Sequence, residues 1–278
     1  MLRKIDPRYP AKLLELERPP EPLWARGNLA VLDRPTVAIV GTRRATAYAE
    51  RVTRALARSL ARAGACVVSG LARGVDAAAH NGALDVDGAT CAVLGTGLDV
   101  VYPAAHASLQ AEIASRGLLL SELEPTNAAH RGSFPNRNRI IAAVASVTIV
   151  VEAGVKSGAL ITSSRAFELG RTVAALPGPI DVPQSLGSNE LLRDGAQVIA
   201  SFADALSLLG LTSAIKLGDI PEGSGERRLW NALEDGSADL DTLATRTGLP
   251  AHEAMAAVAG LEIRGLIECA LTGEIRRL

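Results

Sequence analysis

Short, almost continuously apolar runs alternate with longer amphipathic segments between Thr36 and about Leu211. Strands that read as unbroken apolar runs are buried on both faces, and helices between them supply the covering layers. This alternation is typical of an α/β fold with a parallel, doubly wound sheet. The predicted strands are residues 37–41, 66–69, 91–95, 118–121, 147–151 and 173–176, and the first is followed by a predicted helix over residues 45–63.

The turn that follows each predicted strand is rich in glycine, hydroxyl and basic side chains. In an open parallel sheet these turns meet at the carboxyl edge, where backbone N–H groups and helix N-termini attract anions. We therefore expect them to converge on one crevice that binds a phosphate-bearing ligand. The residues concerned are Gly41, Thr42 and Arg43 after the first strand, Gly70 and Arg73 after the second, Gly95 after the third, and Lys156, Ser157, Gly158 and Thr162 after a later one.

The first turn does not fit a dinucleotide-binding loop. Such a loop needs a second glycine two positions after Gly41, where this chain has Arg43. The second strand should end near an acidic residue for a ribose, but it ends in Ser69 and Gly70. We expect a phosphate ligand here, without NAD and without any other cofactor.

The connection over residues 125–139 contains an unusual aromatic residue. Phe134 precedes a proline and is followed by Arg137, Asn138 and Arg139, in a stretch that we expect to be a polar loop. Exposed aromatic rings next to arginines are typical of proteins that bind single-stranded nucleic acid, because bases stack on the ring and phosphates meet the guanidinium groups. Alternatively, Phe134 anchors the loop on the core. Both hold if one face of the ring is free.

Residues for metal binding or nucleophilic catalysis are not arranged in recognisable patterns. No serine occupies a G-x-S-x-G turn, and Glu152, at a strand end beside a glycine-rich loop, is the best candidate for a catalytic acid. We favour a structural role for Glu152 at a helix terminus. No metal-ligand spacing occurs among His80, His106, His130 and His252, or among Cys66, Cys91 and Cys269, which we expect to be inert thiols.

The charge of the chain is nearly balanced, with a net charge of −1. Residues 36–212 hold 15 basic and 14 acidic side chains, so any basic patch must be local. The N-terminus lacks the apolar segment of a secretory signal, and no apolar run is long enough to span a membrane. The sequence therefore predicts a cytoplasmic protein with no membrane partner.

Proline, glycine and charge divide the chain into four predicted parts. Residues 1–35 form a proline-rich lead-in segment that packs on the sheet edge, residues 36–212 the main domain, residues 213–225 a linker and residues 226–278 a small domain. Three helical patterns and a hairpin around Thr272-Gly273 predict a winged helix in this last part. Its third helical pattern has no Lys or Arg before Arg264, so we expect a protein-contact or structural module.

A series of short motifs over nearly the whole chain resembles the bacterial DNA-processing protein A family, also called DprA or Smf. The motifs are Tyr9-Pro10, Pro19-Pro20, residues 37–43, residues 69–76 with His80, residues 95–99 with Tyr102-Pro103, Ser121-Glu122, residues 134–141, residues 151–153 with Ser157-Gly158 and Thr162, and Pro177-Gly178.

The resemblance implies an extended Rossmann-like fold that binds single-stranded DNA, forms a homodimer and loads the RecA recombinase onto DNA during natural transformation, with no catalysis. Many members have a small helical domain before this core, and we expect no counterpart of it in a chain that starts near Tyr9-Pro10. His106 stands where an asparagine is common. The implied DNA-binding residues are Gly41, Thr42, Arg43, Arg73, Phe134, Arg137, Asn138, Arg139 and Lys156, with Ser157, Gly158 and Thr162 lining the pocket.

A nucleotide-cleaving enzyme is the alternative function. Related Rossmann-like families of the phosphoribohydrolase type cleave nucleoside monophosphates with a glycine-rich loop and a nearby glutamate, and residues 152–162 can be read in that way. However, the loop lacks a Pro-Gly-Gly turn, and the chain has more basic and aromatic positions than one mononucleotide needs. The sequence therefore favours a binder of single-stranded DNA without catalytic residues.

Overall fold

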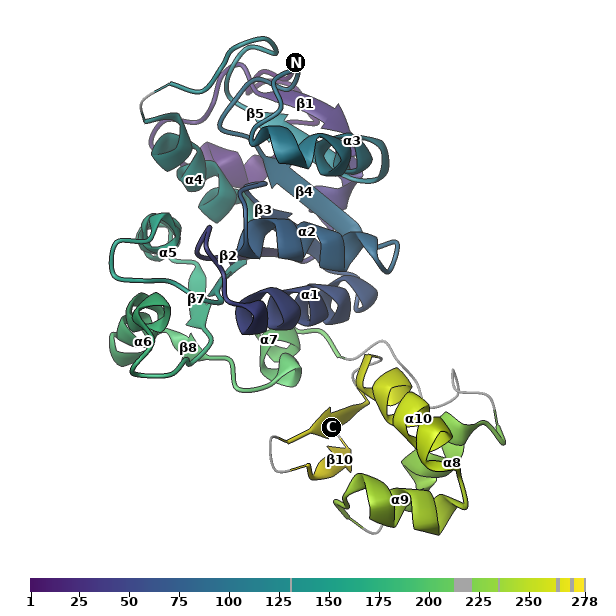
Figure 1. Ribbon diagram of the computed structural model, residues 1–278. Helices are drawn as coiled ribbons and strands as arrows, with labels where there is room; N and C mark the ends of the chain where they lie inside the picture. Colours follow the sequence, from purple (N-terminus) through teal and green to yellow (C-terminus); the bar gives the residue numbers. More distant parts are fainter. Residues whose placement is uncertain (131, 213–221, 235, 264–265, 271–272, 278) are drawn as a thin grey trace. The chain divides into compact units, whose positions relative to one another are not determined.

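The computed structural model describes residues 1–130, 132–212, 222–234, 236–263, 266–270 and 273–277. The chain divides into two compact units, Met1–Thr212 and Ser213–Leu278 (Figure 1). Most of the predicted linker, residues 213–221, lies outside the described residues, as do Arg264 and Thr272.

An eight-stranded sheet forms the centre of the described first unit, in the order β1-β5-β4-β3-β2-β6-β7-β8. The strands from β5 to β8 in this order are parallel, and β1 pairs antiparallel with β5 at one edge. The mostly parallel sheet confirms the predicted fold class. The strands are β1 (Trp24–Gly27), β2 (Thr36–Val40), β3 (Cys66–Ser69), β4 (Ala89–Val93), β5 (Leu118–Ser121), β6 (Val147–Val150), β7 (Thr172–Ala175) and β8 (Gln197–Val198).

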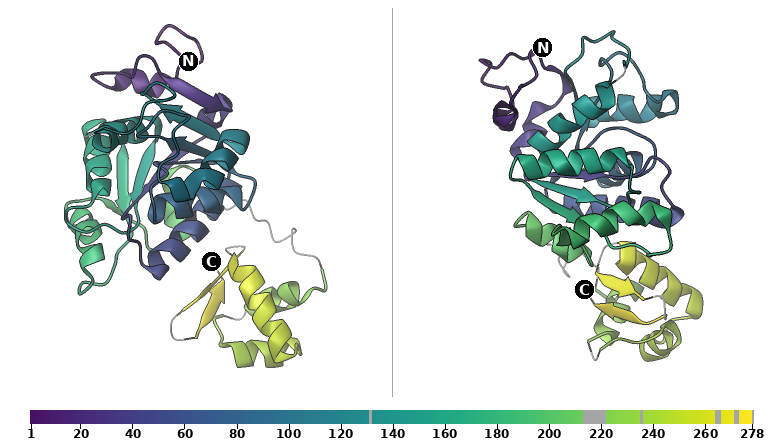
Figure 2. Two further views of the ribbon diagram at one scale, coloured as in Figure 1. Left: turned by 45° about the horizontal axis from the view of Figure 1, so that its top comes forward. Right: turned by 90° about the vertical axis from the view of Figure 1, so that its left-hand side faces the viewer.

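Helices cover both faces of the sheet, as Figures 1 and 2 show. Alternate residues of the central strand face opposite layers, because successive side chains in a strand point to opposite sides. Val37 and Ile39 pack with α1, α2 and α7, whereas Ala38 and Val40 pack with α4 and α5. The helices are α1 (Ala47–Arg62), α2 (Val75–Leu84), α3 (Ala107–Arg116), α4 (Ser133–Val144), α5 (Gly158–Glu168), α6 (Leu186–Arg193) and α7 (Phe202–Leu208), with the short helices η3 (Ala104–His106) and η4 (Pro183–Ser185).

The N-terminal segment is part of the first unit. It contributes β1 and two short helices, η1 (Ala11–Glu15) and η2 (Leu29–Asp33). Leu13 and Leu23 are completely buried in the same core as the central strands. The Lys12 ammonium donates to the hydroxyl oxygens of Thr36 at 2.9 Å and Ser146 at 2.8 Å. Apolar burial and buried polar contacts together fix this segment on the sheet.

The connection before α4 corrects one expectation from the sequence. Residues 125–139 were expected to form a loop, but α4 begins at Ser133, so Phe134 and Arg137 lie in its first turns. Pro135 does not prevent this, since the first N–H groups of a helix have no partner within the helix and a proline there breaks no hydrogen bond. Gly132, with φ of 94°, reverses the chain directly before the helix.

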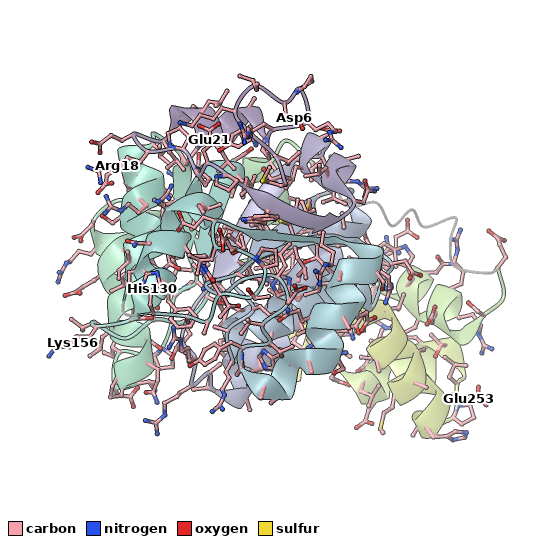
Figure 3. All side chains as sticks on the ribbon, turned by 90° about the horizontal axis from the view of Figure 1, so that it is seen from above. Asp6, Arg18, Glu21, His130, Lys156 and Glu253 are labelled. Carbon is pink, nitrogen blue, oxygen red and sulfur yellow. The ribbon has the colours of Figure 1, made fainter. Side chains whose placement is uncertain are left out.

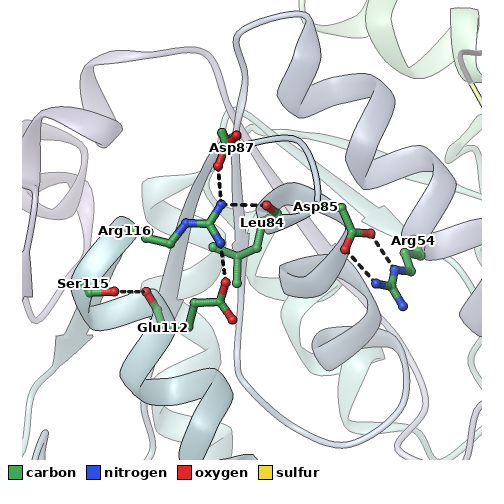
Figure 4. Close-up of polar contacts among 7 residues, drawn as sticks. All are labelled: Arg54, Leu84, Asp85, Asp87, Glu112, Ser115 and Arg116. Carbon is green, nitrogen blue, oxygen red and sulfur yellow. Dashed lines mark hydrogen bonds and ion pairs between the residues drawn. The ribbon is translucent and has the colours of Figure 1, made fainter.

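Ion pairs neutralise basic side chains on the outer helical layer (Figure 4). Arg54 and Arg58 of α1 both pair with Asp85, with nitrogen–oxygen distances of 2.6 Å. Arg116 of α3 pairs with Asp87 at 2.6 Å. These pairs join α1, α2 and α3 at the surface, where such contacts contribute little stability. Their main consequence is that the charges of Arg54, Arg58 and Arg116 are already balanced by carboxylates.

The described residues of the second unit form three helices and a two-stranded antiparallel sheet. The helices are α8 (Gly225–Ala232), α9 (Leu240–Thr247) and α10 (Ala251–Ile263), and the strands are β9 (Ile267–Cys269) and β10 (Ile275–Arg277). Leu229, Leu243, Leu261 and Ile267 pack in its core. This is the helix and hairpin content expected of a winged helix.

Other features of the described residues bear on the kind of protein. None of their helices has the length and apolar character needed to cross a bilayer. Cys66 and Cys91 are buried free thiols, and burial raises the pKa of Cys66 to about 12, which keeps it protonated. Among the described residues, no three His, Cys, Asp or Glu side chains are grouped in a way that could hold a metal ion.

Candidate functional site

The strand order reverses between β2 and β6. From β2 the chain proceeds outward through β3, β4 and β5, then returns to β6 on the other side of β2. Loops leaving the carboxyl ends of β2 and β6 diverge at such a switch point, and ligands of open α/β sheets bind there. A cleft of about 890 Å³ lies at this position. Its lining comes from the loop after β2, the loop after β3 with the first turn of α2, the start of α4, the loop after β6 with the start of α5, and η4.

The loop Gly41–Arg44 forms one wall of the cleft. The Thr42 N–H donates to the Glu152 carbonyl at 2.7 Å, which joins the loops after β2 and β6. Gly41 is required for the close approach, because a Cβ there would lie 2.5 Å from Val75 Cγ2 and 2.9 Å from the Glu152 carbonyl. Arg43 and Arg44 are exposed and line the cleft. Arg44 was not among the residues that the sequence singled out for the site.

Glu152 has a structural position at the base of this wall. It is buried, and its carboxylate accepts hydrogen bonds from the Thr46 N–H at 3.0 Å and the Thr46 hydroxyl at 2.9 Å. Thr46 is the N-cap of α1, and its hydroxyl oxygen accepts from the Ala49 N–H. Glu152 therefore fixes the start of α1, in agreement with the structural role favoured from the sequence.

The loop between β6 and α5 forms the opposite wall. Ser157 is the N-cap of α5, and its hydroxyl oxygen accepts from the Ala159 N–H at 3.3 Å. Lys156 is exposed at the surface (Figure 3), whereas Thr162, one turn into α5, is buried although it also lines the cleft. The Asn138 amide donates to the Gly158 carbonyl at 3.1 Å and so connects α4 to α5. This wall offers a cation and a helix N-terminus to an anion.

Phe134 lies where α4 meets the cleft. Its ring rests on the backbone of Gly95, where a Cβ would lie 2.6 Å from Phe134 Cδ1. The Arg43 guanidinium carbon lies 5.3 Å from the ring centroid, and the Tyr102 ring centroid is 5.1 Å away with the planes tilted by 36°. The ring is only half-buried. Phe134 therefore both anchors the start of α4 and belongs to a surface cluster with Arg43 and Tyr102.

Arg137 is buried beneath the cleft. Its guanidinium donates to the Gly70 carbonyl at 2.6 Å and to the Val93 carbonyl. Burial lowers the pKa of Arg137 to about 10, an effect that the Asp76 carboxylate opposes, so the side chain stays charged at neutral pH. Asp76 in turn accepts from the Gly70 N–H at 3.1 Å. Burial raises the pKa of Asp76, while the Arg137 charge and the backbone N–H donors favour its ionised form.

Gly70 thus connects two buried charges of opposite sign. A Cβ at Gly70 would lie 2.5 Å from both terminal guanidinium nitrogens of Arg137, so only glycine admits the side chain here. The sequence suggested Arg137 as a DNA contact. Its hydrogen bonds to two main-chain carbonyls fix α4 against β3 and β4, and the residue is also part of the cleft lining.

Arg139 and Arg73 lie apart from the cleft lining. Arg139 donates to the Arg18 carbonyl at 2.8 Å and pairs with Glu122. Arg73 is exposed in the loop before α2. The other ten residues implied by the family resemblance line the cleft, whereas Gly70 and Gly95, which were also expected at this crevice, do not. The ten are Gly41, Thr42, Arg43, Phe134, Arg137, Asn138, Lys156, Ser157, Gly158 and Thr162.

Some lining and neighbouring residues were missed from the sequence. Pro183 and Gln184 of η4 complete the lining, and nothing in their local sequence marks them. Tyr102 was noted only as part of a motif, and its proximity to Phe134 depends on how two loops fold together. Chemically, the site combines the exposed cations Arg43, Arg44 and Lys156 with helix N-termini and an aromatic cluster. Such a surface suits phosphates and unpaired bases.

Two family models match the chain. The model of the DNA recombination-mediator protein A family matches residues 1–210, and the model of the DprA winged helix domain matches residues 219–270. The second match supports the winged-helix assignment of the second unit.

Curated relatives and solved structures agree with these matches. DNA processing protein DprA of Mycobacterium tuberculosis is 42% identical over 258 residues, which are 89% of this chain and 66% of the relative, so the chain spans just under two thirds of its length. Protein Smf of Escherichia coli is 36% identical over 96% of this chain and 75% of its own.

Two solved structures have the same fold as the first unit. The crystal structure of DprA from Streptococcus pneumoniae is 42% identical, with a TM-score of 0.72 over 74% of this chain and 72% of that one. A structure of DNA processing protein A from Helicobacter pylori, which describes its binding of single-stranded DNA, is 39% identical, with a TM-score of 0.67 over 72% of this chain and 92% of that one. By sequence and by fold, the chain belongs to the DNA recombination-mediator protein A family, the DprA proteins.

Proposed function

We propose that this chain binds single-stranded DNA in the cleft at the carboxyl ends of β2 and β6. The observation that carries the proposal is the group formed by Arg43, Phe134 and Lys156: Arg43 lies over the Phe134 ring, and Lys156 lines the same cleft at the switch point of the sheet. Phosphates pair with the cations, while unpaired bases meet the aromatic cluster. A related protein, that of Helicobacter pylori, binds single-stranded DNA, which supports the proposal.

The residues divide into three groups, which contact phosphates, contact bases or shape the cleft. Arg43 and Lys156 of the cleft lining and the exposed Arg73 of the loop before α2 neutralise phosphates, and Phe134 stacks with bases. The residues that shape the cleft and offer main-chain and hydroxyl groups are Gly41, Thr42, Asn138, Ser157, Gly158 and Thr162. Arg137 and Arg139 contribute indirectly, because their guanidinium groups are bonded to main-chain carbonyls. Stacking and phosphate contacts do not depend on the base sequence, so we expect weak sequence preference.

We further propose that the chain delivers the bound strand to the RecA recombinase during natural transformation and DNA recombination, acting as a homodimer in the cytoplasm. The support is membership of a family of recombination mediators. This role needs no catalytic group, and the carboxylate of Glu152 accepts two hydrogen bonds from Thr46. We divide the chain functionally into a DNA-binding part up to residue 212, a linker to residue 225 and a C-terminal module that contacts protein.

Fluorescence anisotropy of a labelled oligothymidine, measured over a range of salt concentrations, tests DNA binding. The three cations to which we assign phosphates, Arg43, Arg73 and Lys156, predict a slope of log K against log salt of about −2, at roughly 0.7 per phosphate contact. Arg43→Ala should weaken binding and reduce that slope by about 0.7. Duplex DNA of the same length should bind more weakly, because its bases are not free to stack.

Arg51→Ala is the matched control. Arg51 is also an exposed arginine beside an aromatic ring, at 5.9 Å from the centroid of Tyr48, but it is not part of the cleft lining. Equal weakening by Arg43→Ala and Arg51→Ala would show a diffuse charge effect and contradict the cleft as the site. RecA loading is tested by RecA-driven ATP hydrolysis on DNA coated with single-strand binding protein, which the wild-type chain should accelerate and Arg43→Ala should not.

A further inference from the structure

Tyr102 is the exposed member of the aromatic cluster. Its side chain is 50% exposed, and its ring lies 5.1 Å from that of Phe134, yet it is outside the cleft lining. We propose that Tyr102 is a second base-stacking position, which takes the nucleotide that leaves the cleft past Phe134. The inference rests on the proposed binding of single-stranded DNA and extends that site toward the loop after β4.

Contacts with three neighbours reduce the ring surface that Phe134 offers to a base. Gly95 lies against its ring, Arg43 lies 5.3 Å from its centroid, and Tyr102 adjoins it. The larger free aromatic surface of the cluster is therefore that of Tyr102. In single-strand binding proteins, successive bases stack on neighbouring aromatic side chains, and any base can do so because every base has a π-face.

The loop that holds Tyr102 is fixed on both sides. Upstream, the Thr96 hydroxyl donates to the Val100 carbonyl at 3.0 Å, and Arg26 pairs with Asp99. Downstream, His106 Nδ1 lies in hydrogen-bond contact with the Leu71 carbonyl at 3.0 Å. A side chain on an anchored loop loses little freedom when a base stacks on it, which favours binding.

Arg73 gives this second position a cation. It follows Leu71 and Ala72, the segment to which His106 is bonded, and it is exposed. The next residue, Gly74, packs against the cleft wall formed by the loop Gly41–Arg44, since a Cβ at Gly74 would be 2.5 Å from the Thr42 carbonyl. Arg73 thus lies on a loop that contacts both the cleft wall and the loop of Tyr102. This position explains how Arg73 meets a phosphate although it does not line the cleft.

Photo-crosslinking with an oligonucleotide that contains 5-iodouracil tests the proposal directly, because this base crosslinks to side chains stacked on it. We expect a crosslinked peptide that contains Tyr102 and none that contains Tyr48. Tyr48 is the matched control: it is also 50% exposed and lies beside an arginine, at 5.9 Å from Arg51, but outside the cluster.

Affinity measurements on three variants complete the test. Tyr102→Ala should bind oligothymidine about tenfold more weakly, since stacking on one aromatic side chain accounts for a loss of that order. Tyr102→Phe should bind as the wild type does, because it keeps the ring, and Tyr48→Ala should be unaffected. Equal thermal unfolding temperatures would confirm that the variants are folded.

The outcomes separate this inference from the proposed function. Unchanged affinity of Tyr102→Ala together with loss of binding in Arg43→Ala would overturn the second stacking position and leave the cleft in place. A crosslink to Phe134 but not to Tyr102 would do the same. If the unaltered chain bound single strands no better than duplex, both proposals would be overturned.

Discussion

Replacing Arg137 by methionine should severely destabilise the first unit. Methionine is similar in length but carries no charge and no N–H donor. The change leaves the carbonyl oxygens of Gly70 and Val93 without the guanidinium in a fully buried place. It also removes the positive charge that favours the ionised form of Asp76.

The magnitude follows from the hydrogen bonds and the charge pair that the substitution removes. Hydrogen bonds to a charged group contribute about 1.5–3 kcal/mol each, and Arg137 makes two with main-chain carbonyls. Removing one member of a buried charge pair costs about 3–5 kcal/mol. These two effects overlap, because both include the same desolvated groups, so we expect the free energy of unfolding to fall by about 3–5 kcal/mol in total.

Urea denaturation followed by tryptophan fluorescence measures this change, provided that the two units are separated. Trp24 lies in the first unit and Trp230 in the second. In a Trp230→Phe background, Trp24 alone reports on the unit that contains Arg137. The separation matters because a chain with two units does not unfold in a single two-state transition.

Arg139→Met is the control for the same helix. Arg139 is two residues further along α4, its side chain is 23% exposed, and it pairs with Glu122. Its loss should cost about 1 kcal/mol, as for a partly exposed ion pair. The reasoning is refuted if Arg137→Met costs no more than Arg139→Met, since the two carbonyls would then find other partners.

Three further predictions concern the site and the core. Gly95→Ala should displace the Phe134 ring, 2.6 Å from the new Cβ, and weaken binding of oligothymidine several-fold, whereas an unchanged affinity would show that the ring position is unimportant. Glu152→Leu should cost about 1–2 kcal/mol in urea denaturation, because Thr46 at the start of α1 loses its acceptor; a neutral result would contradict the structural role. Burial lowers the pKa of His80 from its ordinary 6.5 to about 3. As the pH falls below 6.5, His80 therefore takes up a proton in the unfolded chain but not in the folded one, so the free energy of unfolding decreases. Between pH 7 and 5 this should amount to about 2 kcal/mol, absent from His80→Gln, and equal pH slopes for the two proteins would contradict it.

The sheet was predictable from the sequence because its strands are buried on both faces. Residues 147–151 and 66–69 carry almost no polar side chains. Short apolar runs of this kind between helical segments are typical of strands that are buried on both faces of a parallel sheet. The carboxyl-edge rule then located the cleft, as Gly41 and Lys156 show, without knowledge of the strand order.

The start of α4 shows the limit of interpreting a proline from its local sequence. Pro135 suggests a loop, although a proline is tolerated in the first turn of a helix. The burial of Arg137 had no local signal at all, because its acceptors, Gly70 and Val93, belong to two other segments of the chain. Tyr102 was likewise visible only as a motif, and its contact with Phe134 is a tertiary one.

The reversal of strand order also sets the order in which the parts of the cleft are synthesised. Because β3, β4 and β5 all precede β6 in the chain, β2 has no partner on its β6 side until residues 147–150 have been synthesised. An apolar strand edge without a partner is open to pairing with other chains. Pairing with β6 covers this edge, and the residue two positions after β6, Glu152, accepts a hydrogen bond from the Thr42 N–H. The same segment therefore protects the edge of β2 and joins two walls of the cleft.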